Sequence, residues 1–281
     1  MSQQDQLYNS ILDDLATGKL LLPTLPEVAL KVREVVNNQD VTAAQLADII
    51  VTDAALSARL LKVANSALYR GRVPVESVQT AVTRLGLQMV RNLVTSLVME
   101  QMFKPTSRLL EKRMRELWEH STEVAAISQV IASKQPGIKT DEAMLAGLIH
   151  NIGVLPILMR AENTPGLIED DARLEQLIAN LYPHIGEAIL KNWQFPQNLI
   201  TVAAEHANLN RNSGPEGPDL CDIVQVANLQ SYFGTEQALD PQTRHKVLAF
   251  EKLGIDTGIS VVELDENSDE YQEALALFKN F

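Results

Sequence analysis

The chain has 281 residues and carries 24 Lys and Arg against 36 Asp and Glu, a formal net charge of -12. This length allows one large domain or two modest ones, and an apolar content of 46% with 21% charged residues is typical of a folded globule and not of a disordered chain. The acidic balance argues against a general nucleic-acid binder, and the single cysteine, Cys221, excludes an internal disulfide and a thiolate metal cluster.

Helical periodicity is the only strong pattern in the first 105 residues. Thr42 and Gln45 form a capping box at the start of one predicted helix, and Asp53 and Ser77 are capping residues for two others. Gly86 is placed where a helix end favours a positive φ angle. The pattern predicts helices over residues 42–51, 53–66, 77–86 and 87–103.

Pro105 interrupts the helical pattern, because proline cannot donate a hydrogen bond inside a helix. Residues 107–134 contain neither Gly nor Pro and predict the longest helix of the chain. Shorter helices are predicted over residues 141–151, 174–181, 185–193, 196–207 and 219–233. Neither β alternation nor a repeat of fixed period is present, so the sequence predicts an all-α fold.

The organisation along the chain predicts two helical lobes, residues 20–105 and 106–235, followed by an acidic segment over 236–281 that ends in a helix. Only residues 104–107 separate the lobes, and so short a connector implies that the lobes pack on each other. The polar, acidic start of the chain is unlike a signal peptide, and apolar runs fall far short of the roughly 20 residues that span a bilayer. We therefore expect a cytoplasmic protein without membrane contact.

Four of the five histidines are predicted to point inward from separate helices: His120, His150, His184 and His206. His184 follows Pro183 and is placed at a helix start, and the small residues Ala146 and Gly147 before His150 allow another helix to approach closely. Each buried imidazole needs a polar partner. The four side chains either line one polar pocket or are separately satisfied core residues.

Two sets of motifs resemble known families. Leu117-Trp-Glu-His120-Ser121, together with Ala146-Gly-Leu-Ile-His150-Asn151-Ile-Gly153, resembles the HD superfamily of helical metal-dependent phosphohydrolases. The first lobe narrows the resemblance to the HDOD family, whose name denotes an HD-related output domain. The segments that carry this likeness are Leu22-Pro-Thr-Leu-Pro26, the stretch from Asp53-Ala-Ala-Leu56 to Leu60-Leu-Lys-Val-Ala-Asn65-Ser66, and Ala81-Val-Thr-Arg-Leu-Gly86. The resemblance covers residues 20–235 and implies a compact HDOD fold with a degenerate HD-like second lobe.

The resemblance also implies where a metal site would lie. HD enzymes bind divalent metal through a His, a His-Asp pair and a later Asp, and these positions fall on His120, His150, Asn151 and Asn228. Both carboxylates are therefore amides, which offer only a neutral oxygen to a cation. We expect no metal cofactor and no catalytic residue, since nothing would then lower the pKa of an attacking water. A soft transition metal held weakly, with His184 or His206 as a third imidazole, is the alternative.

Other reaction schemes find less support. Cys221 has no histidine within a helical turn, and Ser121 points about 100° away from His120 on the predicted helix. The charged run Lys112-Arg113-Arg115 is interleaved with acidic residues, which is typical of a solvated helix face and not of a nucleic-acid site.

One surface could bind a partner or an anion: Asn65, Ser66, Tyr69, Arg70 and Arg72, placed near the junction of the lobes. The simpler interpretation is a capped helix end with exposed arginines. The functional interpretation is a binding surface that faces the degenerate pocket.

The function expected from these residues is a non-catalytic regulatory or signal-transduction module that acts on a signalling protein in trans. Two alternatives remain open: a phosphohydrolase with unusual His/Asn ligation, and a sensor that binds a small anionic or nucleotide ligand in the same pocket.

Overall fold

The computed structural model of the chain describes residues 9–11, 13–14, 16–17, 19, 26–38, 40–66, 69–105, 107–263 and 265–278. Within these residues all regular secondary structure is helical, which confirms the predicted all-α fold. Residues 22–25 of the first family motif lie outside the described residues. One continuous buried apolar cluster runs through both lobes, so they share a core.

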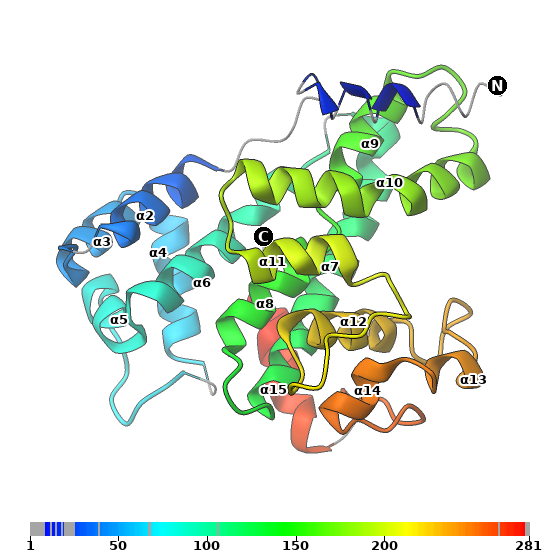
Figure 1. Cartoon of the computed structure of the whole chain (residues 1–281). Coiled ribbons are helices and arrows are strands. Elements are labelled where there is room, and N and C mark those ends of the chain that lie inside the picture. The colour runs from blue at the N-terminus through cyan, green and yellow to red at the C-terminus, as the bar shows by residue number, and fades with distance from the viewer. Residues whose placement is uncertain are drawn as a thin grey trace.

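The first lobe gathers short helices at one end of the molecule (Figure 1). The capping residues read from the sequence act as expected, since Thr42 and Gln45 form a complete capping box and Asp53 and Ser77 accept hydrogen bonds from Leu56 N and Thr80 N. Gly86 has a φ of 84°, which separates two consecutive helices. The helices are α2 (Glu27–Asn37), α3 (Ala43–Ile50), α4 (Ala54–Ala64), α5 (Val78–Leu85) and α6 (Leu87–Met99), with a 3-10 turn η1 (Glu100–Phe103).

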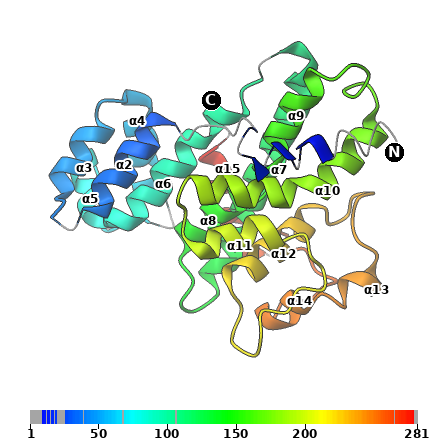
Figure 2. The same cartoon turned by 45° about the horizontal axis from the view of Figure 1, so that its top comes forward.

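The second lobe is built around the long helix α7 (Arg108–Ser133), as the sequence predicts. Its partner α8 (Thr140–Ile149) approaches closely because Gly147 carries no side chain: a Cβ atom there would lie 2.8 Å from Ala125 Cα. The remaining helices of the lobe are α9 (Val154–Glu162), α10 (Asp171–Asn192), α11 (Gln197–Glu205) and α12 (Leu220–Ser231). Figure 2 shows α8, α11 and α12 grouped in this lobe, with α10 lying next to α11.

The predicted break at Pro183 is wrong, because α10 continues through this residue without interruption. Proline removes one helical hydrogen bond, the one to the carbonyl of residue 179. Ala179 lies on the exposed side of α10, where water can take the place of the missing donor. His184 is therefore not at a helix start but inside α10, and it points outward, while Leu181 and Ile185 are buried.

The acidic C-terminal segment folds back on the second lobe. It forms α13 (Pro241–Arg244), α14 (Leu248–Leu253) and α15 (Asp265–Ala276). Helix α15 packs on α7, where Ser133 Oγ donates to Glu270 Oε2 at 3.2 Å and the rings of Trp118 and Phe278 meet edge to face.

One stretch of the chain, Thr140–Glu162, is long and apolar enough to cross a membrane by length and composition alone. It comprises α8, a turn and α9, and 89% of its most apolar window is buried inside the fold. Its apolar character is accounted for by its place in the core.

Candidate functional site

Three histidines from three helices meet in the second lobe. His120 lies on α7, His150 directly follows α8 and His206 directly follows α11. The ring centroids of His120 and His150 are 5.3 Å apart, and those of His150 and His206 are 4.8 Å apart. The structure thus brings together three of the four histidines predicted to point inward, while His184 is exposed on α10.

The helix ends fix the tautomers of His150 and His206. Each ring turns back on its own helix, with Nδ1 of His150 lying 2.6 Å from Gly147 O and Nδ1 of His206 lying 2.7 Å from Val202 O. A carbonyl only accepts, so the proton sits on Nδ1 and the lone pair is on Nε2. In His206 this lone pair accepts a hydrogen bond from the Tyr182 hydroxyl at 3.0 Å.

All three imidazoles are neutral at pH 7. Burial lowers the pKa of His120 to about 4, although a hydrogen bond with Asn228 acts in the opposite direction. Burial also lowers the pKa of His206 to about 4. The pKa of His150 lies well below its usual value because the ring is buried and because His206 and His120 lie beside it.

These lowered pKa values predict that acid destabilises the fold. Unfolded histidines take up protons near pH 6.5, whereas His120 and His206 in the folded state do so only near pH 4. The free energy of unfolding should be insensitive to these groups above pH 6.5 and should fall between pH 6.5 and 4 by roughly 1 kcal/mol per pH unit for each histidine. Urea denaturation at a series of pH values measures this slope.

A matched pair of variants isolates the histidine contribution from that of the carboxylates. His206→Gln should flatten the slope below pH 6.5, whereas His184→Gln, at an exposed position on the neighbouring helix, should leave it unchanged. Equal slopes in the two variants would show that His206 is not buried in its neutral form.

Two asparagines complete the group. Asn151 is buried, and its Oδ1 lies 3.0 Å from the hydroxyl of Ser121, which also lies 2.6 Å from Leu117 O. Asn228 lies on α12 and forms a side-chain hydrogen bond with His120. Ser121 therefore positions an amide, and its contacts do not include the imidazole of a general base.

A cavity of about 550 Å³ opens onto this group. His120, His150, Asn151 and Asn228 line it, with aliphatic side chains of α9 and α10 on another side. Arg113 also lines the cavity and donates to Glu175 Oε1 at 2.6 Å, so its charge is already paired. The cavity thus combines neutral hydrogen-bonding groups with apolar surface.

Two tyrosines also line this cavity, and the sequence patterns did not identify them as site residues. The ring of Tyr232 stacks on His120 with centroids 5.1 Å apart, and Tyr182 bonds His206. Tyr232 lies four residues after Asn228, so helical periodicity placed it on the same face. Tyr182 could not be placed because the predicted break at Pro183 disturbed the register of α10.

The group does not fit a divalent metal centre. The acidic residues that line the cavity are Glu116 and Glu175, which are both exposed, and Glu175 is paired with Arg113. Hard cations require anionic oxygen ligands, and the Nε2 atom of His206 is already bonded to Tyr182. In the described part of the chain, no group of three or more His, Cys, Asp or Glu residues is placed to hold a metal ion.

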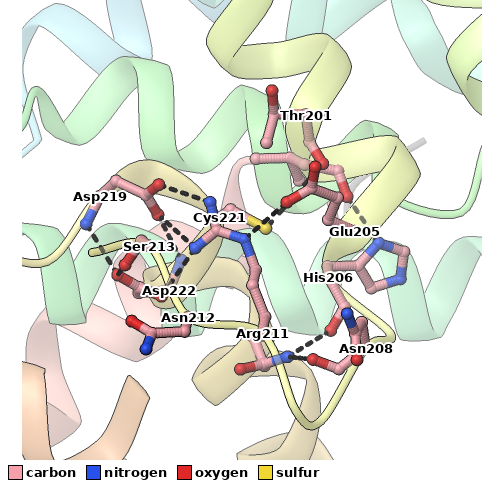
Figure 3. Close-up of polar contacts among 12 residues, drawn as sticks. Thr201, Glu205, His206, Asn208, Arg211, Asn212, Ser213, Asp219, Cys221 and Asp222 are labelled. Carbon is pink, nitrogen blue, oxygen red and sulfur yellow. Dashed lines mark hydrogen bonds and ion pairs between the residues drawn. The ribbon is translucent and has the colours of Figure 1, made fainter. Parts of the chain in front are cut away.

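An ion-pair cluster centred on Arg211 holds the loop between His206 and α12 (Figure 3). The guanidinium of Arg211 is 7% exposed and donates to three carboxylates, those of Glu205, Asp219 and Asp222. Breaking such a buried arrangement by removing one partner is costly, so the loop is firmly anchored. The cluster thereby keeps His206 at the end of α11.

Cys221, beside this cluster, is a structural residue. Burial raises the pKa of its thiol to about 12, so the thiolate form that a nucleophile needs is not populated at neutral pH.

The predicted binding surface lies at the end of α4, and the side chains of its first two residues, Asn65 and Ser66, have structural roles. Asn65 bridges the loop with three backbone contacts, donating to Leu61 O and Val75 O and accepting from Val75 N at 2.7 Å. The Tyr69 hydroxyl lies 3.4 Å from Thr140 Oγ1 at the start of α8. His150 follows the opposite end of the same helix. Ser66 donates to Val63 O, and Arg70 and Arg72 are exposed.

Comparison with known proteins identifies similar chains. A family model for the HDOD domain matches residues 22–209. The chain is similar to a Shewanella amazonensis SB2B protein named "Putative metal-dependent phosphohydrolase", with 35% identity, a TM-score of 0.85 and coverage of 99% of this chain and 100% of that one. It shares its fold with an HDOD domain protein of unknown function from Geobacter sulfurreducens, with 22% identity, a TM-score of 0.67 and coverage of 98% and 99%.

A longer relative is an uncharacterized protein of Treponema pallidum (strain Nichols), which is 26% identical over 253 residues. The match covers 82% of this chain and 46% of the relative. The chain thus spans about half the length of the curated relative it matches.

Proposed function

The chain belongs to the HDOD family, and we propose that it is a non-catalytic regulatory module that binds a small polar ligand and acts on a signalling protein through contact. One observation supports the proposal: Asn151 and Asn228, the positions that the HD resemblance assigns to carboxylate ligands, line one cavity with imidazoles that are neutral at pH 7. Such a site lacks the negative charge that would offset the desolvation of a divalent cation. Without the cation, no group activates a water for attack on phosphorus.

The cavity that remains suits a small neutral or anionic molecule. Amide, imidazole and phenol groups offer donors and acceptors, and the stacked pair of Tyr232 and His120 offers aromatic surface. Ligand pockets commonly combine apolar surface with a few polar groups that fix orientation, and a volume near 550 Å³ is within their usual range. Nucleotides are the first compounds to test.

The experiment has a catalytic arm and a binding arm. Purified protein is assayed on generic phosphoesters with Mg²⁺, Mn²⁺, Fe²⁺, Ni²⁺ and Zn²⁺, and its melting temperature is measured against a nucleotide panel. We expect turnover no greater than that of His150→Ala, and a rise in melting temperature with at least one compound that Tyr232→Ala abolishes. Turnover that depends on His150, or no stabilisation by any compound, would contradict the proposal.

The name of the Shewanella relative favours a second candidate, a metal-dependent phosphohydrolase with His and Asn ligands. This candidate requires stoichiometric metal at His120, His150 and Asn151 in the purified protein. Metal analysis of protein prepared without chelators therefore distinguishes it from the regulatory module.

The cellular setting belongs to the same proposal. We place the protein in the cytoplasm, with its partner a separate signalling protein and not nucleic acid or a membrane. The net charge of -12 disfavours association with polyanions.

A further inference from the structure

A second cavity, of about 200 Å³, lies between the two lobes. It shares no lining residue with the histidine cavity. Arg33 and Asn37 of α2 and Arg91 and Asn92 of α6 line it from the first lobe, and Phe195 and the start of α11 close it from the second. Among the described residues that line this cavity there is no carboxylate.

Arg33 is held in place at the cavity wall. Its Nη2 donates to Gln194 O at 2.8 Å, and its guanidinium carbon lies 4.3 Å from the centroid of the Phe195 ring. Gln194 has a φ of 56° because it occupies the left-handed position that ends α10, where Phe195 N donates to Leu190 O and Gln194 N donates to Lys191 O, both at 2.9 Å. This helix cap thus fixes the carbonyl that accepts from Arg33.

Arg91 is the second cation and is differently placed. Its guanidinium makes no hydrogen bond and no ion pair within 4.0 Å to any residue in the described part of the chain. The nearest acids are Asp141 and Glu142, which raise the pKa of Arg91 without contacting it and accept from neutral amides, Asn92 Nδ2 at 2.8 Å and Asn198 Nδ2 at 2.6 Å. Arg91 therefore lines the cavity with a guanidinium that no described neighbouring group bonds.

The two guanidinium groups lie in a partly buried setting. Burial lowers the pKa of both arginines, and the charge of Arg91 lowers the pKa of Arg33 further, whereas Glu142 and Asp141 act against the effect of burial on Arg91. Two like charges brought together in a half-buried cavity favour an anion between them. The planar fork of arginine matches the oxygens of a phosphate group, and the volume admits a small phosphorylated molecule.

We propose that this interlobe cavity binds a small phosphate-bearing anion through Arg33 and Arg91. The site is independent of the histidine cavity, so it stands or falls separately from the proposed function. An anion held here would join α2 and α6 of the first lobe to the α10–α11 connection of the second.

Inorganic phosphate is the probe, with sodium chloride and sodium acetate at equal ionic strength as references. We expect phosphate to raise the melting temperature of the full chain beyond the effect of either reference, with a dissociation constant measurable by calorimetry. Arg91→Gln should weaken phosphate binding by about tenfold or more, because it removes a charged donor. Arg108→Gln, at an exposed arginine of α7 outside the cavity, should bind phosphate as the unmodified chain does.

Three results would overturn the proposal: no phosphate effect beyond chloride, full binding by Arg91→Gln, or an equal effect of acetate, which would assign the cavity to carboxylates. If Arg91→Gln does not fold, Arg91→Lys keeps the charge and removes the fork. Arg91→Lys should also bind phosphate more weakly than the unmodified chain, and unchanged binding would count against the bidentate contact.

Discussion

Replacing Asn151 and Asn228 together with aspartate is expected to create a strong divalent-cation site. The two carboxylates would bring two negative charges beside His120 and His150. An added carboxylate near a cation contributes about 4 kcal/mol at an effective dielectric constant of 20, so Mn²⁺ affinity should rise by at least ~1,000-fold. Calorimetric titration with Mn²⁺ measures this change.

The stability of the same variant gives an independent readout. Without metal, two carboxylates in a buried polar group repel each other and should lower the melting temperature, and Mn²⁺ should restore it. Asn192→Asp combined with Asn210→Asp adds the same charge at exposed positions and serves as the control. If the unmodified chain binds Mn²⁺ as tightly as the double variant, the proposed loss of the metal site is wrong. If the double variant does not bind it, these asparagines do not occupy the ligand positions.

Much of the fold was predictable because its signals are local. A capping box needs only Thr42 and Gln45, and a helix without Gly or Pro over 107–134 is visible as a pattern. The error at Pro183 arose because proline disfavours a helix locally, whereas the burial of Leu181 and Ile185 in the core outweighs the one lost hydrogen bond.

The site was predictable only in part, because its contacts join distant segments. Motif resemblance located His120, His150, Asn151 and Asn228, which line one cavity. The hydrogen bond from Tyr182 to His206 could not be derived, since it depends on how α10 crosses the end of α11. The cavity between the lobes was invisible for the same reason: Arg33 and Phe195 are separated by more than half of the chain.

Helices α9 and α10 cross closely because Gly153 has no side chain. We therefore expect Gly153→Ala to lower the stability of the fold strongly. The φ of Gly153 is -65°, which any residue can adopt, so glycine is needed for space and not for conformation. A Cβ atom there would lie 2.0 Å from Tyr182 O and 2.6 Å from Gly186 N, both backbone atoms that move only with the helix. We expect a loss of about 3 kcal/mol or more in the free energy of unfolding.

Gly186→Ala is the matched control, because it adds a methyl group to the opposite side of the same crossing. Its Cβ would lie 3.4 Å from Ala203 Cβ, and Gly186 is inside α10, where alanine favours the helix by up to about 1 kcal/mol. Urea denaturation of both variants should therefore separate them by several kcal/mol, and equal stabilities would show that α10 does not approach Gly153 so closely. Because Tyr182 lies at the point of contact and its hydroxyl bonds His206, displacing α10 would also remove a polar partner from the histidine cluster.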